Sequence, residues 1–266
     1  SPWAPDADAR GDGASPKKVM TKLSVNVNKI ATLRNTRTLD IPNVARLSKI
    51  ALDAGADGIT VHPRPDERHI RPRDVDDLAA LVRRYPGAEY NIEGNPFHGL
   101  VEHCRRIRPK QATLVPDARE ALTSNHGFNL VELGFAERKA LRSAIEALHA
   151  MGSRVSLFMD PVPDLMPLAK TLGADRIELY TEPYAAAAMR GQEAASLASY
   201  AVAARAARDA GLGVNAGHDL NLQNLPAFLR EAGPIDEVSI GHALIADALE
   251  FGLADTVKRY LSLCRA

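Results

Sequence analysis

The sequence predicts a (β/α)8 barrel, and three observations support this fold class. From Lys22 onward, short β-rich runs alternate with longer segments of helical periodicity. Eight such units fit into about 240 residues, which is the usual size of one barrel of this class. The apolar fraction of 45% and the charged fraction of 25% are those of a soluble globular protein of 266 residues. Strict alternation of strand and helix implies parallel strands joined by crossover helices.

Each expected strand is a short run rich in β-branched or apolar residues, and each expected helix has apolar residues at helical spacing. In chain order, the strands are expected at residues 23–28, 58–62, 89–92, 112–115, 154–159, 176–180, 213–216 and 237–240. The helices are expected near residues 43–54, 73–84, 97–107, 136–151, 164–172, 192–210, 222–231 and 244–261. Several of these helices end at a glycine, which adopts the left-handed conformation without a steric clash. Residues 54–59 (AGADGI) and 172–177 (LGADRI) are nearly identical, which predicts one type of helix-to-strand turn used twice.

The alternative to a barrel is an open, doubly wound sheet. Such a sheet normally has a glycine-rich phosphate turn after its first strand. The first expected strand ends in Val25-Asn26-Val27-Asn28-Lys29, with neither a glycine nor a Walker pattern. The barrel is therefore the favoured fold class.

Composition excludes several classes of partner. Lys+Arg and Asp+Glu are 33 each, and a zero net charge argues against nucleic-acid binding. No apolar run is long enough to cross a membrane. Two cysteines without a CxxC motif indicate a reducing compartment, which we take as the cytoplasm. Residues 1–21 lack the apolar region of a secretory signal and are expected to be a mobile extension, with residues 22–266 forming one catalytic barrel domain.

Ionisable side chains stand at the carboxyl ends of the expected strands. In a barrel these ends converge on one mouth, where the chemistry of this fold takes place. Three histidines and two glutamates come from five different strands: His62, Glu93, Glu178, His218 and His242. Because burying so many ionisable groups is costly unless they are paired or used, we interpret them as one acid–base cavity.

Two sets of residues around this mouth are typical of anion sites. Gly217-His218 and Gly241-His242 follow the seventh and eighth strands, where barrels commonly hold a phosphate on backbone N–H groups. Arg64 and His69 follow the second strand, and residues 34–37 (RNTR) are expected to form a further basic loop over the mouth. Two anion sites at one acid–base cavity indicate two phosphorylated small-molecule substrates.

The residue types restrict the mechanism. Histidine exchanges protons near neutral pH, and a glutamate becomes a base when its pKa is raised. No GxSxG motif is present, no cysteine ends a strand, and no lysine ends the fifth or sixth strand. The histidines lack HxH or HExxH spacing, so no metal is expected. The mechanism that remains is repeated proton transfer on carbonyl substrates. Two alternatives stay open: a phosphosugar isomerase or aldolase with one phosphate, and a non-catalytic barrel that binds phosphorylated metabolites.

Several segments of the chain, in order, resemble the pyridoxine 5′-phosphate synthase family. They are residues 25–35 (VNVNKIATLRN), 54–64 (AGADGITVHPR), 68–70 (RHI), 155–158 (VSLF), 214–218 (VNAGH) and 240–245 (IGHALI), and the resemblance extends from Leu23 to the C-terminus. It implies a (β/α)8 barrel that condenses 1-deoxy-D-xylulose 5-phosphate with 3-amino-2-oxopropyl phosphate into pyridoxine 5′-phosphate, phosphate and water. It also implies that no metal or organic cofactor is used and that the chain assembles as a homo-octamer.

The resemblance also assigns a role to individual residues. His62 would be a proton acceptor, Glu93 a second general base and His218 a proton donor. Glu178 would stabilise a charged transition state. The xylulose substrate would contact Asn28, Lys29, Arg64, His69 and Thr123, with its phosphate on Arg64 and His69. The amino-ketone phosphate would contact Asn26, Arg37, Asp219, Gly241 and His242.

Two departures from the family pattern stand at substrate-binding positions. Many members have Asp-His where this chain has Asn28-Lys29, which replaces a negative charge by an amide and adds a cation. Asp219 occupies a position where glycine is common. A carboxylate would repel a phosphate, so we expect the backbone N–H of Asp219 to face the ligand.

Overall fold

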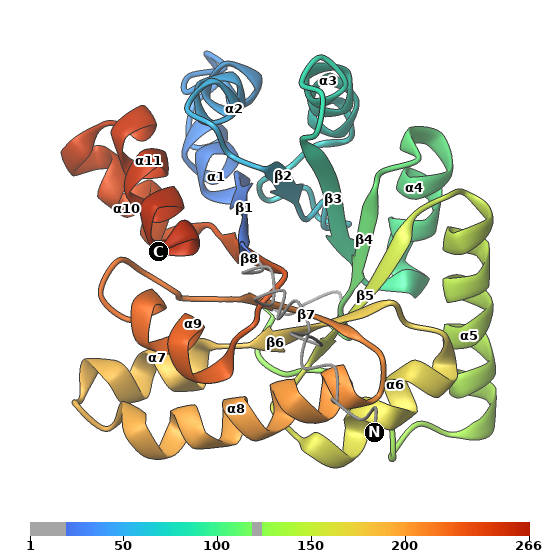
Figure 1. Ribbon diagram of the computed structural model, residues 1–266. Coiled ribbons are helices and arrows are strands. Elements are labelled where there is room, and N and C mark those ends of the chain that lie inside the picture. The colour runs from blue at the N-terminus through green and yellow to red at the C-terminus, as the bar shows by residue number, and fades with distance from the viewer. Residues whose placement is uncertain (1–19, 119–123) are drawn as a thin grey trace, which may run out of the picture.

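The computed structural model describes residues 20–118 and 124–266, and its centre is a closed barrel of eight parallel strands (Figure 1). The strands are β1 (Lys22–Asn26), β2 (Gly58–Val61), β3 (Glu89–Gly94), β4 (Gln111–Leu114), β5 (Arg154–Met159), β6 (Arg176–Tyr180), β7 (Gly213–Gly217) and β8 (Glu237–Ile240). They follow one another around the barrel in chain order, and β8 closes it against β1 with Val238 beside Leu23. The predicted (β/α)8 barrel is confirmed, and the open sheet is excluded.

Helices surround the barrel (Figure 1). They are α1 (Asn28–Asn35), α2 (Val44–Asp53), α3 (Pro72–Val82), α4 (Val101–Ile107), α5 (Phe135–Ala150), α6 (Met166–Leu172), α7 (Glu182–Met189), α8 (Glu193–Asp209), α9 (Leu225–Ala232), α10 (His242–Phe251) and α11 (Leu253–Arg265). Short helical turns, η1 (Pro96–Leu100) and η2 (Pro163–Leu165), precede α4 and α6. The C-terminal helix α11 packs against α2, which completes the outer ring.

The structure differs from the predicted elements in several places. The first strand ends at Asn26, because the Asn26 side chain accepts the Asn28 N–H (3.0 Å) and α1 begins there. The helix expected at 244–261 is two helices, because Gly252 takes a left-handed conformation (φ 78°) between α10 and α11. The helix expected near 97–107 starts in the distorted turn η1, where Gly99 has φ 97°. Helices α1, which begins two residues after β1, and α7, directly after β6, were not expected at all.

The repeated turn is confirmed, and an aspartate defines it. Gly55 and Gly173 both end a helix in the left-handed region, at φ 101° and 107°. Two residues later, Asp57 Oδ2 accepts the Leu23 N–H (2.9 Å) and Asp175 Oδ2 accepts the Val155 N–H (2.8 Å). Each carboxylate thus ties the start of one strand to the strand before it, which helps to set the register around the barrel.

Apolar residues pack between the strands and the helices, whereas the barrel interior is polar. Strand side chains alternate between these two faces. Inside, Ser24 bonds Thr60 (2.6 Å), and Thr113 donates to Asn91 (3.1 Å). Gln111 donates to Glu237 (3.0 Å). Because nearly every strand contributes hydrogen-bonding groups to the interior, these bonds offset the cost of burying them there.

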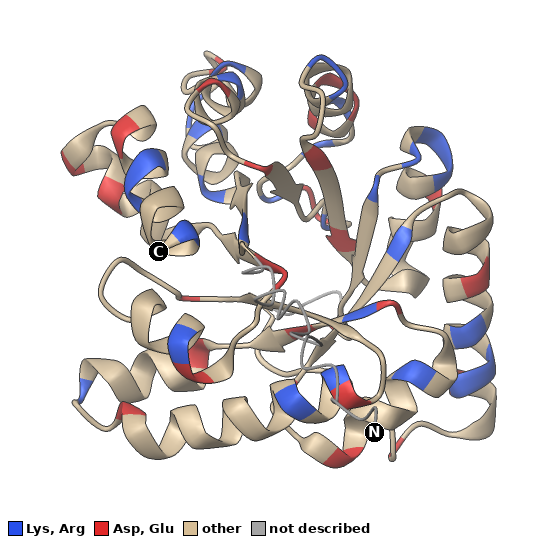
Figure 2. Cartoon of the chain, viewed as in Figure 1, with Lys and Arg blue, Asp and Glu red and all other residues tan. Residues whose placement is uncertain are grey.

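The surface carries both signs of charge, with acidic and basic residues interspersed on the outer helices (Figure 2). Across the described ranges, no helix combines the length and apolar character needed to cross a membrane. Cys104 is buried on α4 as expected for a small apolar residue, and burial raises the pKa of its thiol to about 12. The predicted extension lies almost wholly outside the described residues and stays a prediction.

Candidate active site

The carboxyl ends of the strands surround a cavity of about 430 Å³. Because parallel strands all end at the same rim, residues far apart in the sequence meet there. Its lining consists of Asn26, Asn28, Lys29, Thr32, His62, Arg64, Arg68, His69, Glu93, Ser124, Glu178, His218, Asp219, Ser239, Gly241 and His242. The ionisable residues that were expected to meet at one mouth therefore do line a common cavity.

Two buried glutamates stand on the cavity wall. Glu93 is the fifth residue of β3 and Glu178 the third of β6, so both point into the barrel from their strands. Burial raises the pKa of Glu93 well above its usual range, and Glu178, Asp117 and Glu237 raise it further. Burial, followed by Glu237, raises the pKa of Glu178 to about 8. With both pKa values raised, each carboxyl keeps its proton to a higher pH than a free glutamate does, so it can donate a proton and can accept one after it has ionised.

Glu178 is held in a closely packed position. It is 2% exposed, and its Oε2 has no hydrogen-bond partner within the part of the chain that the structure describes. A Cβ on Gly217 of the neighbouring strand β7 would lie 2.4 Å from Glu178 Oε1. Glycine at this position therefore makes room for the carboxyl group.

His62 follows β2 directly and is buried. Its backbone N–H donates to Asn28 Oδ1 (2.9 Å), which ties the end of β2 to the start of α1. Burial first, and then Arg64 and His69, lower the pKa of His62 well below 6.5. The imidazole is therefore neutral at neutral pH and has a lone pair available to accept a proton.

His218 directly follows β7, which lies three strands from β2 around the barrel. Its ring packs against Phe158 (4.9 Å between centroids) and Tyr180 (5.4 Å). Its backbone is left-handed (φ 80°), an uncommon state for a residue with a Cβ. Thr181 Oγ1 donates to the carbonyl oxygens of Gly217 and His218, which stabilises this turn. Burial lowers the pKa of His218.

Arg64 forms a basic corner of the cavity together with His69. The Arg64 guanidinium donates to Asp117 Oδ2 (2.7 Å), and both side chains are almost fully buried. Ser124 Oγ donates to the same carboxylate oxygen (2.7 Å). Burial first, and then Arg64, Lys29 and Arg68, lower the pKa of His69 to about 4. This corner can bind an anion through a fixed cation and a neutral imidazole N–H.

A second corner lies at the ends of β7 and β8. Helix α10 begins at His242 with Gly241 before it, so its first N–H groups lie near the cavity mouth. A Cβ on Gly241 would lie 3.1 Å from the Asn26 Cβ, so glycine permits close packing of β8 on β1. Asp219 has φ 61°, a conformation that glycine adopts readily. That its backbone N–H, and not its carboxylate, faces a ligand stays a prediction.

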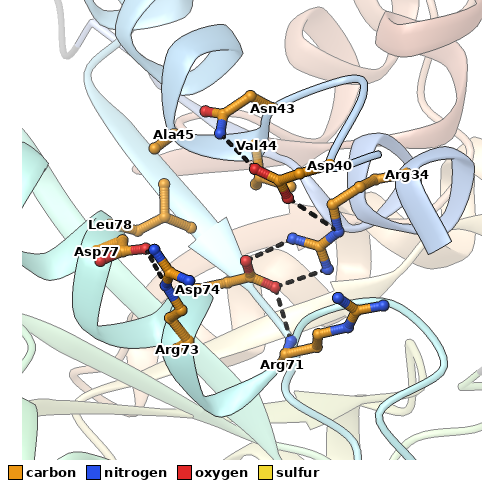
Figure 3. Close-up of a pocket in the computed structure, with 10 residues that line it drawn as sticks. All are labelled: Arg34, Asp40, Asn43, Val44, Ala45, Arg71, Arg73, Asp74, Asp77 and Leu78. Carbon is orange, nitrogen blue, oxygen red and sulfur yellow. Dashed lines mark hydrogen bonds and ion pairs between the residues drawn. The ribbon is translucent and has the colours of Figure 1, made fainter. Parts of the chain in front are cut away.

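The cavity brings together all but two of the predicted site residues. Thr123 lies outside the described residues. Arg37 is exposed and is not part of the cavity lining. The prediction of a basic loop at residues 34–37 was wrong for residues 34 and 35, which form the last turn of α1. There the Arg34 side chain is buried against Asp74 of α3 rather than lying over the mouth (Figure 3).

Five residues at or beside the cavity were not predicted as site residues: Thr32, Arg68, Ser124, Ser239 and Asp117. Thr32 lies one turn after Asn28 on α1, which could not be foreseen without that helix. Ser239 precedes Gly241 by two residues on the inward face of β8, so strand alternation could have found it. Asp117 follows the end of β4, so the rule that polar residues at the carboxyl ends of strands face the cavity could have found it. No group of three or more His, Cys, Asp or Glu side chains among residues 20–118 and 124–266 is arranged to hold a metal ion.

Solved structures with a similar backbone are other barrels of low sequence identity. Tryptophan synthase from M. tuberculosis matches with a TM-score of 0.64 and 11% identity, covering 93% of this chain and 94% of that one. Thiamine phosphate pyrophosphorylase from Pyrococcus furiosus matches with a TM-score of 0.57 and 14% identity, covering 91% and 95%. At such identities the likeness concerns the fold alone.

Sequence comparison is more specific. Residues 23–266 match the profile of the family described as pyridoxal phosphate biosynthesis protein PdxJ. A pyridoxine 5′-phosphate synthase from Albidiferax ferrireducens is 56% identical over 246 residues, which are 91% of this chain and 96% of that protein. Its counterpart from Xanthomonas axonopodis pv. citri is 51% identical over 253 residues, which are 92% and 97%. The family suggested by the sequence motifs is therefore confirmed, and the chain belongs to the pyridoxal phosphate biosynthesis protein PdxJ family.

Proposed function

We propose that this chain is a pyridoxine 5′-phosphate synthase, which condenses 1-deoxy-D-xylulose 5-phosphate with 3-amino-2-oxopropyl phosphate. The observation that supports the proposal is one cavity in which Glu93, Glu178, His62 and His218 lie between the Arg64–His69 corner and the Gly241–His242 corner. Two phosphorylated substrates need two anion sites, and their condensation needs several proton transfers at one place. The names of the relatives at 51–56% identity point to the same reaction.

The charge states of the side chains suit this chemistry. The substrate amine condenses with the ketone of the other substrate, so no lysine of the protein is needed as nucleophile. His62 is neutral and therefore suited to accept a proton. Because the pKa of Glu93 is raised, this residue would act as the second base only after it has given up its own proton. His218 is assigned as the donor and would pass on a proton that it receives during the reaction, because burial lowers its pKa. Glu178 retains its proton up to pH about 8, so it can donate a hydrogen bond to charge that develops on the intermediate. General acid–base assistance of this kind is worth roughly 10²–10⁴-fold per step.

The two substrates are assigned to the two corners. The xylulose phosphate would bind Arg64 and His69, with Asn28 and Lys29 beside it and Thr123 completing the contact. The amino-ketone phosphate would bind over Gly241, His242 and Asp219, next to Asn26, and Arg37 is proposed as a further contact. Lys29 adds a cation near the xylulose substrate, so its positive charge would replace contacts made by Asp-His in other family members.

The test is to mix both substrates with the purified protein and to follow pyridoxine 5′-phosphate and released phosphate. The wild-type protein should form both, whereas His62→Ala and Glu93→Gln should lose about 10²–10⁴-fold in kcat while keeping the wild-type circular dichroism spectrum. Binding of both substrates without any product would refute the proposal in favour of a binding protein. Full activity of either variant would refute the role assigned to that residue.

The assembly proposed along with this activity is a homo-octamer in the cytoplasm that works without a metal or an organic cofactor. Mass measurement in solution should then give eight times the 28.7 kDa of one chain. Activity should persist after dialysis against a chelator, and loss of activity that a divalent metal restores would contradict the cofactor part of the proposal.

A further inference from the structure

Outside the cavity, an ion pair joins the end of α1 to the start of α3 (Figure 3). Arg34 is 2% exposed, and its guanidinium bonds both carboxylate oxygens of Asp74, with 2.9 Å between Nη2 and Oδ2. Asp74 Oδ2 also accepts the Arg71 N–H (2.8 Å), which caps α3. The same Nη2 of Arg34 donates to the His69 carbonyl oxygen (3.0 Å). One side chain therefore connects α1, α3 and the loop between β2 and α3.

Asn35 extends this connection along the loop. Its Oδ1 accepts from Arg34 Nε (3.1 Å) and Nη2 (3.0 Å), which orients the amide. Its Nδ2 then lies within donating distance of three successive carbonyl oxygens, those of Glu67 (3.3 Å), Arg68 (3.0 Å) and His69 (2.9 Å). Glu67 has a left-handed backbone (φ 52°), which costs energy in a residue with a Cβ and persists only when its surroundings hold it.

The other side of this loop faces the cavity, where Arg68 and His69 are part of the lining. His69 Nδ1 accepts the Ile70 N–H (2.9 Å), so the proton of the neutral imidazole is on Nε2. The charged groups around the ring are Arg64, Lys29, Arg68 and Asp66, and the His62 ring lies 6.3 Å away. The direction in which Nε2–H points is therefore set by the backbone of residues 67–70.

We propose that Arg34, Asn35 and Asp74 are positioning residues, which hold the backbone of residues 67–69 so that His69 presents its Nε2–H to the xylulose phosphate. This rests on the proposed function for the identity of the ligand. All three lie outside the cavity lining, so they act through the loop and not by contact with substrate. The planar guanidinium is required, because a lysine ammonium cannot match two carboxylate oxygens and a carbonyl in one plane.

Two variants and a matched control test this proposal. Asn35→Ala removes the amide and leaves the Arg34–Asp74 pair, while Arg34→Lys keeps the charge and loses the planar fork. The control is Asp76→Asn, which breaks the half-exposed ion pair of Asp76 with Arg106 on the same helix α3. For each protein we would measure kcat, KM for each substrate, the Tm, and the NMR titration of His69 without substrate.

The expected result is a selective one. Both variants should raise KM for the xylulose phosphate on the order of tenfold, the equivalent of one hydrogen bond to a charged group. KM for the amino-ketone phosphate should stay unchanged, as should all values for Asp76→Asn. In the variants the His69 titration should move up from about 4 toward 6.5, because a displaced ring is less buried. In a His69→Ala background, Asn35→Ala should add no further increase in KM.

Other outcomes overturn the proposal. A lower Tm with equal effects on both KM values and an unchanged His69 titration would mean that the network only stabilises the fold. If Arg34→Lys fails to fold, Asn35→Ala alone decides the question, since it leaves the ion pair in place. Failure of the wild-type protein to form pyridoxine 5′-phosphate would refute the proposed function, whereas the titration of His69 in the substrate-free protein tests the positioning independently.

Discussion

Replacement of Glu178 by glutamine should change how the stability of the protein depends on pH. Glu178 is 2% exposed and its Oε2 accepts no hydrogen bond from the described residues, so the ionised form is poorly solvated. Burial raises the pKa of this carboxyl from 4.5 to about 8. In the folded protein it therefore keeps its proton up to pH about 8, whereas in the unfolded chain it loses the proton above about 4.5.

The direction of the effect follows from this difference. Between pH about 4.5 and about 8 the unfolded chain binds fewer protons at this residue than the folded protein, so stability falls as pH rises. One pKa unit corresponds to ~1.4 kcal/mol, so the full fall is roughly 4–5 kcal/mol once pH exceeds 8. Glutamine has nearly the same shape and cannot ionise. The Glu178→Gln variant should therefore match the wild-type protein near pH 4.5 and exceed it in stability above pH 8.

Thermal unfolding followed by circular dichroism across this pH range measures the effect. A gain of a few kcal/mol in a chain of this size corresponds to a Tm higher by on the order of 10 °C at alkaline pH. Glu146→Gln, on the exposed side of α5, is the matched control and should leave the curve of Tm against pH unchanged. Parallel curves for Glu178→Gln and the wild-type protein would refute the argument that burial holds this carboxyl in its neutral form.

Two further substitutions test the packing of the cavity wall. Asp117→Asn should lower the free energy of unfolding by about 3–5 kcal/mol, because the buried Arg64 guanidinium loses its carboxylate; a urea midpoint equal to that of the wild-type protein would contradict this. Gly217→Ala should reduce kcat more than tenfold, since the new methyl group would lie 2.4 Å from Glu178 Oε1 and displace that carboxyl. Unchanged kcat in Gly217→Ala would show that Glu178 has freedom to move.

Local sequence determined the order of the strands and, to within two residues, their limits. Each strand is a short run of β-branched or apolar residues, as predicted. The residues that form a turn lie within a few positions of one another, as in the two similar turns that contain Asp57 and Asp175. Once the alternation of strand and helix implied a barrel, the rule that strands end at one rim placed His62 and Glu93 in one cavity. These inferences succeed because they depend on local periodicity and on a general property of parallel strands.

Tertiary structure alone decided which distant residues pair and how burial changes their chemistry. Asn28 looked like the end of a strand and instead begins α1, because the Asn26 side chain captures its N–H. Arg34 looked like part of a surface loop, yet it is buried against Asp74, forty positions later in the chain. The pKa of Glu178 rises because the closed barrel removes water from around it. Such effects depend on three-dimensional proximity and solvent exclusion, which no local pattern in the sequence contains.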